Sequence, residues 1–301
     1  MSSPTPSPMP GDALDPRLTP ARPDLADLRL RGRVAAERFT AGTPRRVAVG
    51  AVALRRRPSL ACGFETEAVM GDRVTVYDEA DGFAWVQLAA DGYVGYLEAG
   101  ALGPADPAPT HRVAALRTFL YPAPDLKRPN LGHLGLGAAF AVEGREGDYL
   151  RLPSGAYLFA PHAAALDARE PDFAATAERL VGTPYLWGGR TSLGLDCSGL
   201  VQLCLALAGI PAPRDADQQE RALGLPRPTD LAGLARGDLV FWRGHVGLMR
   251  DADTLIHANG HHMMVAVEPV REAVARILAG SYGPVTSVRR IDAALSPSSA
   301  T

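Results

Sequence analysis

Apolar and polar residues alternate in a series of short runs that begins near residue 46. Alternation with a period of two is typical of half-buried β-strands, and Asp-Gly pairs favour tight hairpin turns. Such pairs stand at Asp81-Gly82 and Asp91-Gly92. The alternating runs around them are Val47–Ala51, Val74–Val76, Trp85–Leu88 and Tyr93–Leu97. We therefore predict a small antiparallel barrel over residues 46–108.

The same pattern then occurs a second time. The run Trp85–Leu88 corresponds to Tyr149–Leu152, and the turn at Asp91-Gly92 corresponds to Ser154-Gly155. A repeated pattern of this length indicates a repeated structural unit. We therefore predict a second barrel over residues 109–168.

After Glu170 the pattern becomes that of a mixed α+β domain. Residues Phe173–Val181 have helical periodicity, and Leu200–Leu207 are apolar nearly all round, as in a buried helix that ends at Gly209. Strands are expected at Leu239–Trp242, Val246–Met249, Thr254–His257 and Val265–Val267. These elements predict an α+β domain over residues 169–292.

The two ends of the chain carry weaker patterns. Residues 1–45 are rich in Pro, Ala, Arg and Asp, and we predict a partly disordered or helical arm with one helix near Ala21–Phe39. A loosely packed arm is favoured here over a functional one. Residues 293–301 are predicted to form a disordered tail. Because Met1–Asp12 lack the features of a signal peptide, we expect a cytoplasmic protein with no membrane partner.

Composition narrows the classes of function. The 301 residues carry a formal net charge of -2, so no basic surplus points to nucleic acid. The three cysteines are odd in number and have no metal-ligand spacing, so neither a disulfide framework nor a metal site is expected. We expect a monomer that needs no cofactor.

Among the cysteines, Cys197 has the context of a nucleophile. It lies between a glycine-rich loop and the apolar helix, where the helix dipole favours the thiolate form. A thiolate in that place suits covalent catalysis, although a buried structural cysteine is the alternative. Cys204 fits a core position better, and Cys62 has no distinguishing context.

Two histidines are the best candidates for the base that such a thiol needs. His245 and His257 fall on neighbouring predicted strands, and a hairpin would bring their imidazoles close together. One can take the thiol proton while the other holds its tautomer. A metal pair is the alternative, with His261 or His262 as a third ligand, but no carboxylate stands at convincing spacing.

Several separate motifs then resemble one family. They are Gly182–Gly189, Asp196–Gln202, Gly237–Trp242, Gly244–Gly247 and Ile256–Ala258, and together they resemble the NlpC/P60 cysteine peptidases. The run Asp91–Tyr96 resembles bacterial SH3-type barrels. The resemblance implies an α+β, papain-like NlpC/P60 catalytic domain preceded by two small all-β SH3-type barrels. The whole chain looks like the cytoplasmic γ-D-glutamyl-L-diamino acid endopeptidases that recycle murein peptides.

The resemblance also implies roles for individual residues. Cys197, His245 and His257 match the nucleophile, the base and the residue that orients it, while Tyr185 matches an oxyanion-stabilising tyrosine. The implied substrate is a small murein peptide with a free L-alanine amine. The matching substrate-binding residues are Asp196, Ser198, Asp215, Glu67 and Tyr93 or Tyr96. Ala216 departs from the family, which often has serine there.

Two other functions remain open at this point. One is an exported hydrolase of intact peptidoglycan. The other is a catalytically inert protein that binds wall peptides through its barrels.

Overall fold

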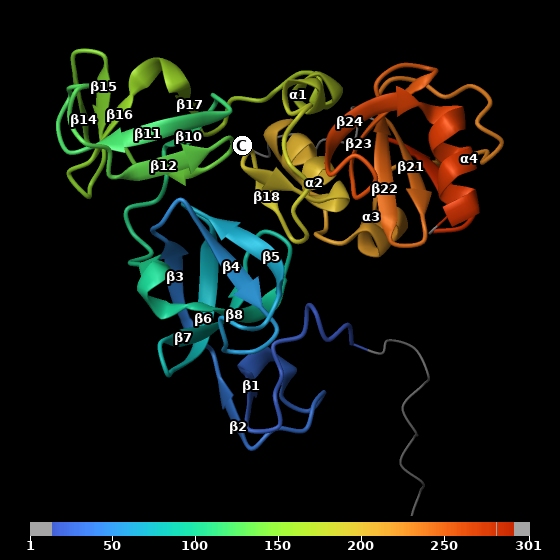
Figure 1. The fold of residues 1–301 in the computed structure, drawn as a ribbon. Coiled ribbons are helices and arrows are strands. Elements are labelled where there is room, and N and C mark those ends of the chain that lie inside the picture. Colours follow the sequence, from blue (N-terminus) through green and yellow to red (C-terminus); the bar gives the residue numbers. More distant parts are fainter. Residues whose placement is uncertain (1–13, 281, 292–301) are drawn as a thin grey trace, which may run out of the picture.

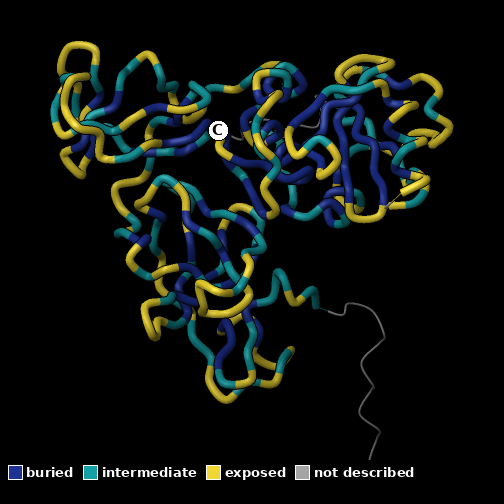
Figure 2. Tube along the Cα trace, viewed as in Figure 1, coloured by how far each residue is buried: buried dark blue, intermediate teal, exposed yellow. Residues whose placement is uncertain are grey.

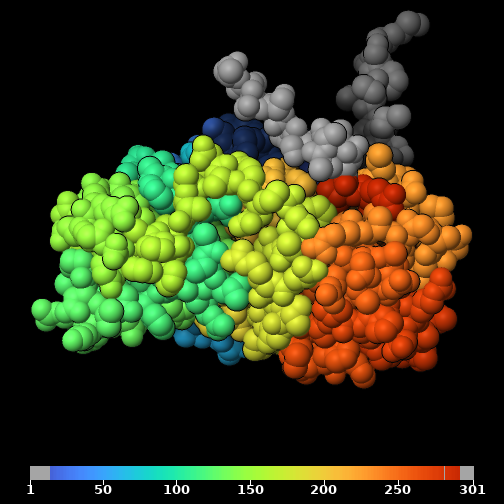
Figure 3. All heavy atoms as spheres, turned by 90° about the horizontal axis from the view of Figure 1, so that it is seen from above, coloured from blue at the N-terminus to red at the C-terminus, as the bar shows by residue number. Residues whose placement is uncertain are grey.

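The computed structural model describes residues 14–280 and 282–291, which form two successive all-β units and a C-terminal α+β unit (Figure 1). The Ser/Pro-rich start and the predicted tail at 293–301 lie outside the described residues. In the view from above, the second β unit and the C-terminal sheet lie on opposite sides (Figure 3). Among the described residues, no helix is both long and apolar enough to cross a membrane.

The first β unit is a seven-stranded sheet in the order β5-β4-β8-β7-β6-β3-β9. The predicted turn between β6 and β7 is confirmed, because Asp81 (φ 51°) and Gly82 (φ 80°) both adopt the left-handed conformation that such a hairpin turn needs. Alternate strand residues, among them Val74 and Val86, form one buried core. The strands are β3 (Thr43–Val47), β4 (Ala51–Arg55), β5 (Phe64–Val69), β6 (Arg73–Ala80), β7 (Phe83–Leu88), β8 (Val94–Glu98) and β9 (Leu102–Gly103).

The helix predicted near Ala21–Phe39 is not present in the structure. In place of a helix near Ala21–Phe39, the structure has β1 (Leu25–Asp27), a 3-10 turn at Leu28–Leu30, and β2 (Arg38–Thr40), which pairs in parallel with β1. Leu25 packs on Tyr77 and Trp85 of the first β unit. The guanidinium of Arg22 lies 4.5 Å from the Trp85 ring centroid and pairs with Asp78. These tertiary contacts order a segment that is too short and polar to show a period of its own.

The second β unit has a separate core, which includes Val113, Leu134 and Leu158. Its strands form a three-stranded sheet, β13-β10-β17, and a five-stranded sheet, β12-β11-β16-β15-β14. They are β10 (His111–Val113), β11 (Arg117–Tyr121), β12 (Gly132–Gly135), β13 (Ala139–Phe140), β14 (Gly144–Glu146), β15 (Tyr149–Arg151), β16 (Tyr157–Phe159) and β17 (Ala163–Ala165). Both units that precede the α+β part are therefore all-β, as predicted.

The C-terminal unit is built on a six-stranded sheet in the order β20-β25-β21-β22-β23-β24. Its strands are β20 (Leu225–Arg227), β21 (Asp238–Trp242), β22 (His245–Met249), β23 (Thr254–Asn259), β24 (Met264–Pro269) and β25 (Ser287–Arg290). The helices are α1 (Phe173–Arg179), α2 (Cys197–Leu207), α3 (Ala216–Ala222) and α4 (Val270–Gly280), and the short pair β18 (Arg190–Thr191) and β19 (Gly194–Leu195) precedes α2. The predicted helices and strands of this unit are confirmed.

The sheet is buried on both faces, which explains why β21 is apolar without alternation (Figure 2). Leu239 and Phe241 belong to the core that contains α2, whereas Val240 and Trp242 belong to the core that contains α4. The helix that begins with Cys197 therefore packs directly against β22 and β23, the two strands that carry the candidate histidines.

Strand β1 supplies a test of its packing against the first β unit. Leu25 is 4% exposed, so Leu25→Ala should lower the free energy of unfolding by about 2–5 kcal/mol. Leu28, three residues on, is 46% exposed, and Leu28→Ala should cost less than about 0.5 kcal/mol. Urea denaturation followed by tryptophan fluorescence, to which Trp85 contributes, measures both. Equal, small effects would show that β1 is not part of the folded core.

Candidate active site

Cys197 is the first residue of α2, where the sequence predicted it, and its position is fixed by Asp196. The Asp196 carboxylate caps the helix by accepting the Gly199 N–H at 2.7 Å. Its other oxygen accepts the Gly188 N–H at 2.9 Å, which fastens the glycine-rich loop. The thiol is therefore held rigidly between loop and helix.

The charge state of this thiol differs from the expectation. Burial, together with the nearby Asp196 carboxylate, raises the pKa of Cys197 to about 12. The backbone N–H groups of Val246 and Ser198 act in the opposite direction but do not prevail. The helix start alone does not favour the thiolate, and the resting group at neutral pH is a thiol.

The structure brings the two candidate histidines together. His245 begins β22, His257 lies on the adjacent antiparallel β23, and His245 Nε2 lies 2.8 Å from His257 Nδ1. The His245 ring also stacks on Tyr282, with 5.5 Å between centroids and 11° between planes. Burial and the neighbouring His257 lower the pKa of His245 to about 3, so this imidazole is neutral at rest.

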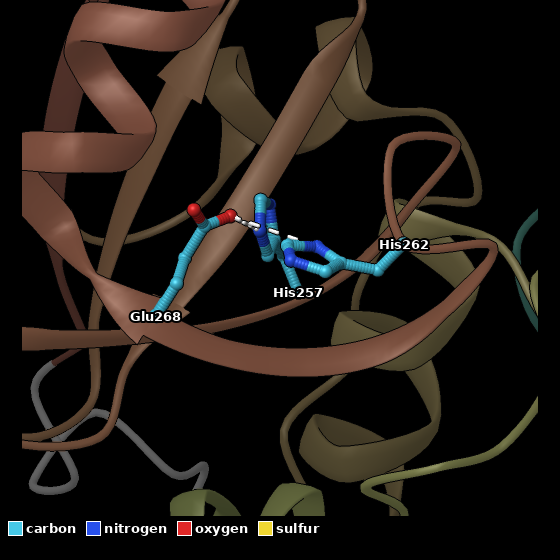
Figure 4. A group of neighbouring side chains, drawn as sticks. All are labelled: His257, His262 and Glu268. Carbon is cyan, nitrogen blue, oxygen red and sulfur yellow. Dashed lines mark hydrogen bonds and ion pairs between the residues drawn. The ribbon is translucent and has the colours of Figure 1, made fainter.

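A carboxylate that the sequence analysis missed extends this pair into a chain of hydrogen-bonded side chains, here called the proton chain. Glu268 Oε1 lies 2.6 Å from His257 Nε2 (Figure 4). The same oxygen is paired with Arg276 of α4. Burial alone would raise the pKa of Glu268, but the hydrogen bonds from His257 and Arg276 outweigh it and lower the pKa to about 2. Glu268 is therefore an anion that can only accept.

The negative charge of Glu268 determines which imidazole nitrogens of His257 and His245 carry a proton. Because Glu268 accepts from His257 Nε2, that nitrogen carries the proton and His257 Nδ1 is left as an acceptor. His257 Nδ1 then accepts a hydrogen bond from the N–H at His245 Nε2. The remaining nitrogen of His245, Nδ1, keeps its lone pair. His245 and Cys197 line the same cavity, so a neutral base is available there for the thiol proton.

The side chains around Glu268 are also a candidate metal site. Ligand atoms of His257, His262 and Glu268 lie within 4.8 Å of one another (Figure 4). The expectation that no carboxylate lies near the histidines is therefore wrong. However, the Glu268 carboxylate already accepts hydrogen bonds from His257 and Arg276. A metal ion bound to Glu268 would have to replace both contacts. The cluster fits a proton chain better than a cation site.

The cleft continues past Cys197 toward the first β unit. Two adjoining cavities share Tyr185, Trp187, Cys197 and Gly244, and the histidines line the first of them. The second cavity carries charged and polar groups from three parts of the chain. These groups are Arg17, Arg56, Glu65, Tyr93, Asp196, Ser198, Asp215 and Asp217.

Two of the predicted substrate-binding residues meet in this second cavity. Asp215 Oδ2 accepts from the Tyr93 hydroxyl at 3.3 Å and from Arg17 at 2.7 Å. Burial raises the pKa of Asp215, although Arg214 and Arg17 oppose that shift. Burial, followed by the Asp215 charge, raises the pKa of Tyr93. The phenol is therefore a neutral donor to the carboxylate.

Two other predicted residues lie elsewhere. The Glu67 carboxylate accepts the backbone N–H of Arg190 at 2.8 Å and does not line the cleft. Glu65, two residues earlier on β5, lines it instead. The Tyr96 hydroxyl accepts from Arg22 at 3.1 Å, outside the cleft. The motif identified the strands correctly, but the residue along each strand depends on a bulge and a domain interface that sequence does not reveal.

Asp196 and Ser198 do line the cleft, but their polar atoms are occupied by Arg214, a buried residue that the sequence analysis missed. Arg214 donates to Asp196 Oδ2 at 2.6 Å and to Ser198 Oγ at 2.9 Å. Its Nε donates to Thr66 of the first β unit at 2.6 Å. These contacts hold the loop before the nucleophile against the barrel.

Tyr185, the predicted oxyanion-stabilising residue, lies in the cleft. It borders both cavities beside Cys197, and its backbone N–H donates to the Met263 carbonyl at 2.9 Å. Burial, and then the nearby Cys197, raises the pKa of its phenol. A neutral phenol next to the thiol can donate a hydrogen bond to an oxyanion.

Two family models match parts of the chain. Residues 182–277 match the model of the NlpC/P60 family, and residues 54–102 match that of the bacterial dipeptidyl-peptidase Sh3 domain. Residues 182–277 belong to the NlpC/P60 family. The match to the Sh3 domain covers the first β unit only, so a second SH3-type domain stays a prediction.

Named relatives of the chain are peptidases. Dipeptidyl-peptidase 6 of Lysinibacillus sphaericus is 39% identical over 85 residues, which are 28% of this chain and 30% of that protein. Gamma-D-glutamyl-L-lysine dipeptidyl-peptidase of Bacillus subtilis is 35% identical over 96 residues, or 29% and 31% of the two chains. The chain thus spans less than a third of the length of these two relatives.

One solved structure matches over most of the chain. An NlpC/P60 family protein from Bacillus cereus superposes with a TM-score of 0.68 at 20% identity, covering 82% of this chain and 99% of the other. At that identity the match concerns the fold alone.

The raised thiol pKa predicts how Cys197 reacts. In a variant with Cys62→Ser and Cys204→Ser, alkylation by iodoacetamide should be slow near pH 7 and should accelerate by about tenfold per pH unit up to about pH 9. The sign follows from the pKa of about 12, because the thiolate fraction rises throughout that range. A rate that is fast and constant above about pH 5 would instead reveal a resting thiolate–imidazolium pair.

The proton chain predicts the tautomers of the histidines. Near pH 7, nitrogen-15 NMR of the imidazoles should show both His245 and His257 as neutral rings protonated at Nε2. In Glu268→Gln the preference at His257 should weaken, since the anionic acceptor is gone. Glu272→Gln, on the exposed side of α4, is the matched control and should leave the spectrum unchanged. Protonation of His257 at Nδ1 in the unmodified protein would contradict the chain.

Proposed function

We propose that this protein is a cysteine endopeptidase of cell-wall peptides that cleaves the γ-D-glutamyl–diamino acid bond when the preceding L-alanine has a free amine. The diamino acid would be meso-diaminopimelate or lysine. The proposal is carried by one observation. The thiol with its histidine chain shares a cleft with a cluster of carboxylates drawn from two domains.

In the proposed reaction, His245 Nδ1 takes the proton of Cys197 while Sγ attacks the γ-carbonyl carbon of D-glutamate. The carbonyl oxygen becomes an oxyanion that Tyr185 stabilises by donating a hydrogen bond. The C–N bond then breaks, and His245 returns the proton to the leaving amine of the diamino acid. Water, deprotonated by the same imidazole, hydrolyses the thioester and releases L-Ala-D-Glu.

The charge states of the resting site shape this first step. A thiol with a raised pKa and an imidazole with a lowered pKa both start neutral. Proton transfer and carbon–sulfur bond formation should therefore accompany each other, because a separate ion pair is disfavoured in this buried site. Glu268 contributes by stabilising the positive charge that passes to the histidine pair during the transfer.

Selectivity would arise in the second cavity. Asp215 and Glu65 present carboxylates, and Tyr93 presents a hydroxyl, at the end of the cleft away from the histidines. An ammonium group that leaves water needs such charged partners. An acylated nitrogen has no charge to offer them. The names of the two relatives, a dipeptidyl-peptidase and a γ-D-glutamyl-L-lysine dipeptidyl-peptidase, support this substrate class.

The proposal assigns the enzyme to recycling of released murein peptides in the cytoplasm, where it would act as a monomer without a cofactor. Cell fractionation and size-exclusion chromatography test the location and the oligomeric state directly.

Turnover of defined peptides tests the activity. L-Ala-γ-D-Glu-diaminopimelate should be cleaved into L-Ala-D-Glu and diaminopimelate, and its N-acetyl derivative should react at least about a hundredfold more slowly in kcat/KM. Cys197→Ala should abolish both reactions. Glu65→Gln should raise KM for the free peptide several-fold, whereas its neighbour Glu67→Gln, outside the cleft, should leave KM within about twofold.

Other outcomes separate the alternatives. Equal behaviour of the native protein and Cys197→Ala would leave the inert wall-peptide-binding protein as the better hypothesis. Digestion of purified sacculi at a rate that matches the free tripeptide would favour a hydrolase of intact peptidoglycan.

A further inference from the structure

A segment that precedes the first barrel reaches into the cleft. Residues 15–22, here called the strap, run from the first β unit to α3 of the catalytic unit. On the barrel side, the Val94 N–H donates to the Arg17 carbonyl at 2.7 Å, and the Gln87 amide donates to the Leu18 carbonyl at 2.9 Å. On the catalytic side, the Gln218 amide donates to Asp15 at 3.2 Å. The strap is thus hydrogen-bonded both to the first β unit and to the catalytic unit.

Arg17 is the strap residue that lines the cleft. Its guanidinium donates to Asp215 Oδ2 at 2.7 Å, to both carboxylate oxygens of Asp217 at 2.8 and 2.9 Å, and to both oxygens of Asp15. A planar guanidinium held by three carboxylates has little freedom to move. Arg17 therefore stands as a fixed wall beside Asp215, the carboxylate proposed to receive the substrate amine.

The charges around Arg17 still permit a cation to bind. Five carboxylates border this region, those of Asp15, Glu65, Asp196, Asp215 and Asp217. Four guanidinium groups pair with them, those of Arg17, Arg56, Arg214 and Arg221. Five negative charges against four positive charges leave one negative charge, which suits an ammonium group. Arg17 limits the space at Asp215 without cancelling the attraction for an amine.

We propose that Arg17 is a specificity-determining residue that closes the cleft beyond the substrate amine and so excludes peptides extended or acylated at that nitrogen. This inference rests on the proposed function. Any group attached to an amine at Asp215 would have to share its space with the guanidinium of Arg17. Exclusion of acylated peptides then comes from the strap as well as from the missing charge.

The test compares two substrates in each of three proteins. The ratio of kcat/KM for the free tripeptide to that for its N-acetyl derivative is measured in the native protein, in Arg17→Ala and in Arg22→Ala. Arg17→Ala should lower the ratio at least about tenfold, mainly by accelerating the N-acetyl peptide. Arg22→Ala is the matched control, because Arg22 belongs to the strap but its side chain contacts Asp24, Asp78, Trp85 and Tyr96, none of which lines the cleft. Its ratio should stay within about twofold of the native value.

The remaining outcomes decide against the proposal. An unchanged ratio in a folded Arg17→Ala variant overturns it, and so does a higher ratio, which would mean that Arg17 only competes with the amine. If Arg17→Ala does not fold, Arg17→Gln, which keeps a polar chain of lesser reach, must show the same fall. Failure of the native protein to cleave either peptide would refute the proposed function itself, and equal cleavage of both would refute its free-amine requirement.

Discussion

The buried guanidinium of Arg214 is the contact on which the site depends. It is 1% exposed and joins Asp196 and Ser198 on either side of the nucleophile to Thr66 of the first β unit. Asp196 in turn caps α2 and holds the glycine-rich loop. Loss of one partner from a buried ion pair leaves the other charge uncompensated, which is strongly destabilising. The barrel and the catalytic helix are therefore linked through the same carboxylate that positions the thiol.

The chemistry of the site follows from the burial of its thiol and its imidazole. Burial makes the thiol a weaker acid and the imidazole a weaker base, which keeps both groups uncharged until a substrate arrives. Glu268 supplies a fixed negative charge next to the histidines, and hydrogen bonds from His257 and Arg276 keep it ionised. A neutral resting site of this kind protects the sulfur from solvent electrophiles and oxidants, which react with thiolates.

Sequence was sufficient for features that depend on local pattern. Helices α1 and α2 and strands β21–β24 of the C-terminal unit, the Asp-Gly hairpin of the first barrel, and the placement of Cys197, His245 and His257 all follow from periodicity and motif. The features that sequence could not reveal depend on contacts between distant residues. Glu268 meets His257 through the register of β23 and β24, and β1 is ordered by Tyr77 and Trp85. The thiol pKa depends on burial, which no helix-start argument contains.

The strap has a consequence for the order in which the cleft is completed. Arg17 and Asp215 are separated by 198 positions in sequence, so the guanidinium of Arg17 finds its partners on α3 only after the catalytic unit is present. Contacts between residues so distant in sequence form slowly, because the intervening loop must first be closed. The nucleophile and its histidines lie within one domain and need no such wait. During folding, the ability to react and the ability to discriminate therefore arise at different moments, and they combine when the catalytic unit and the strap meet.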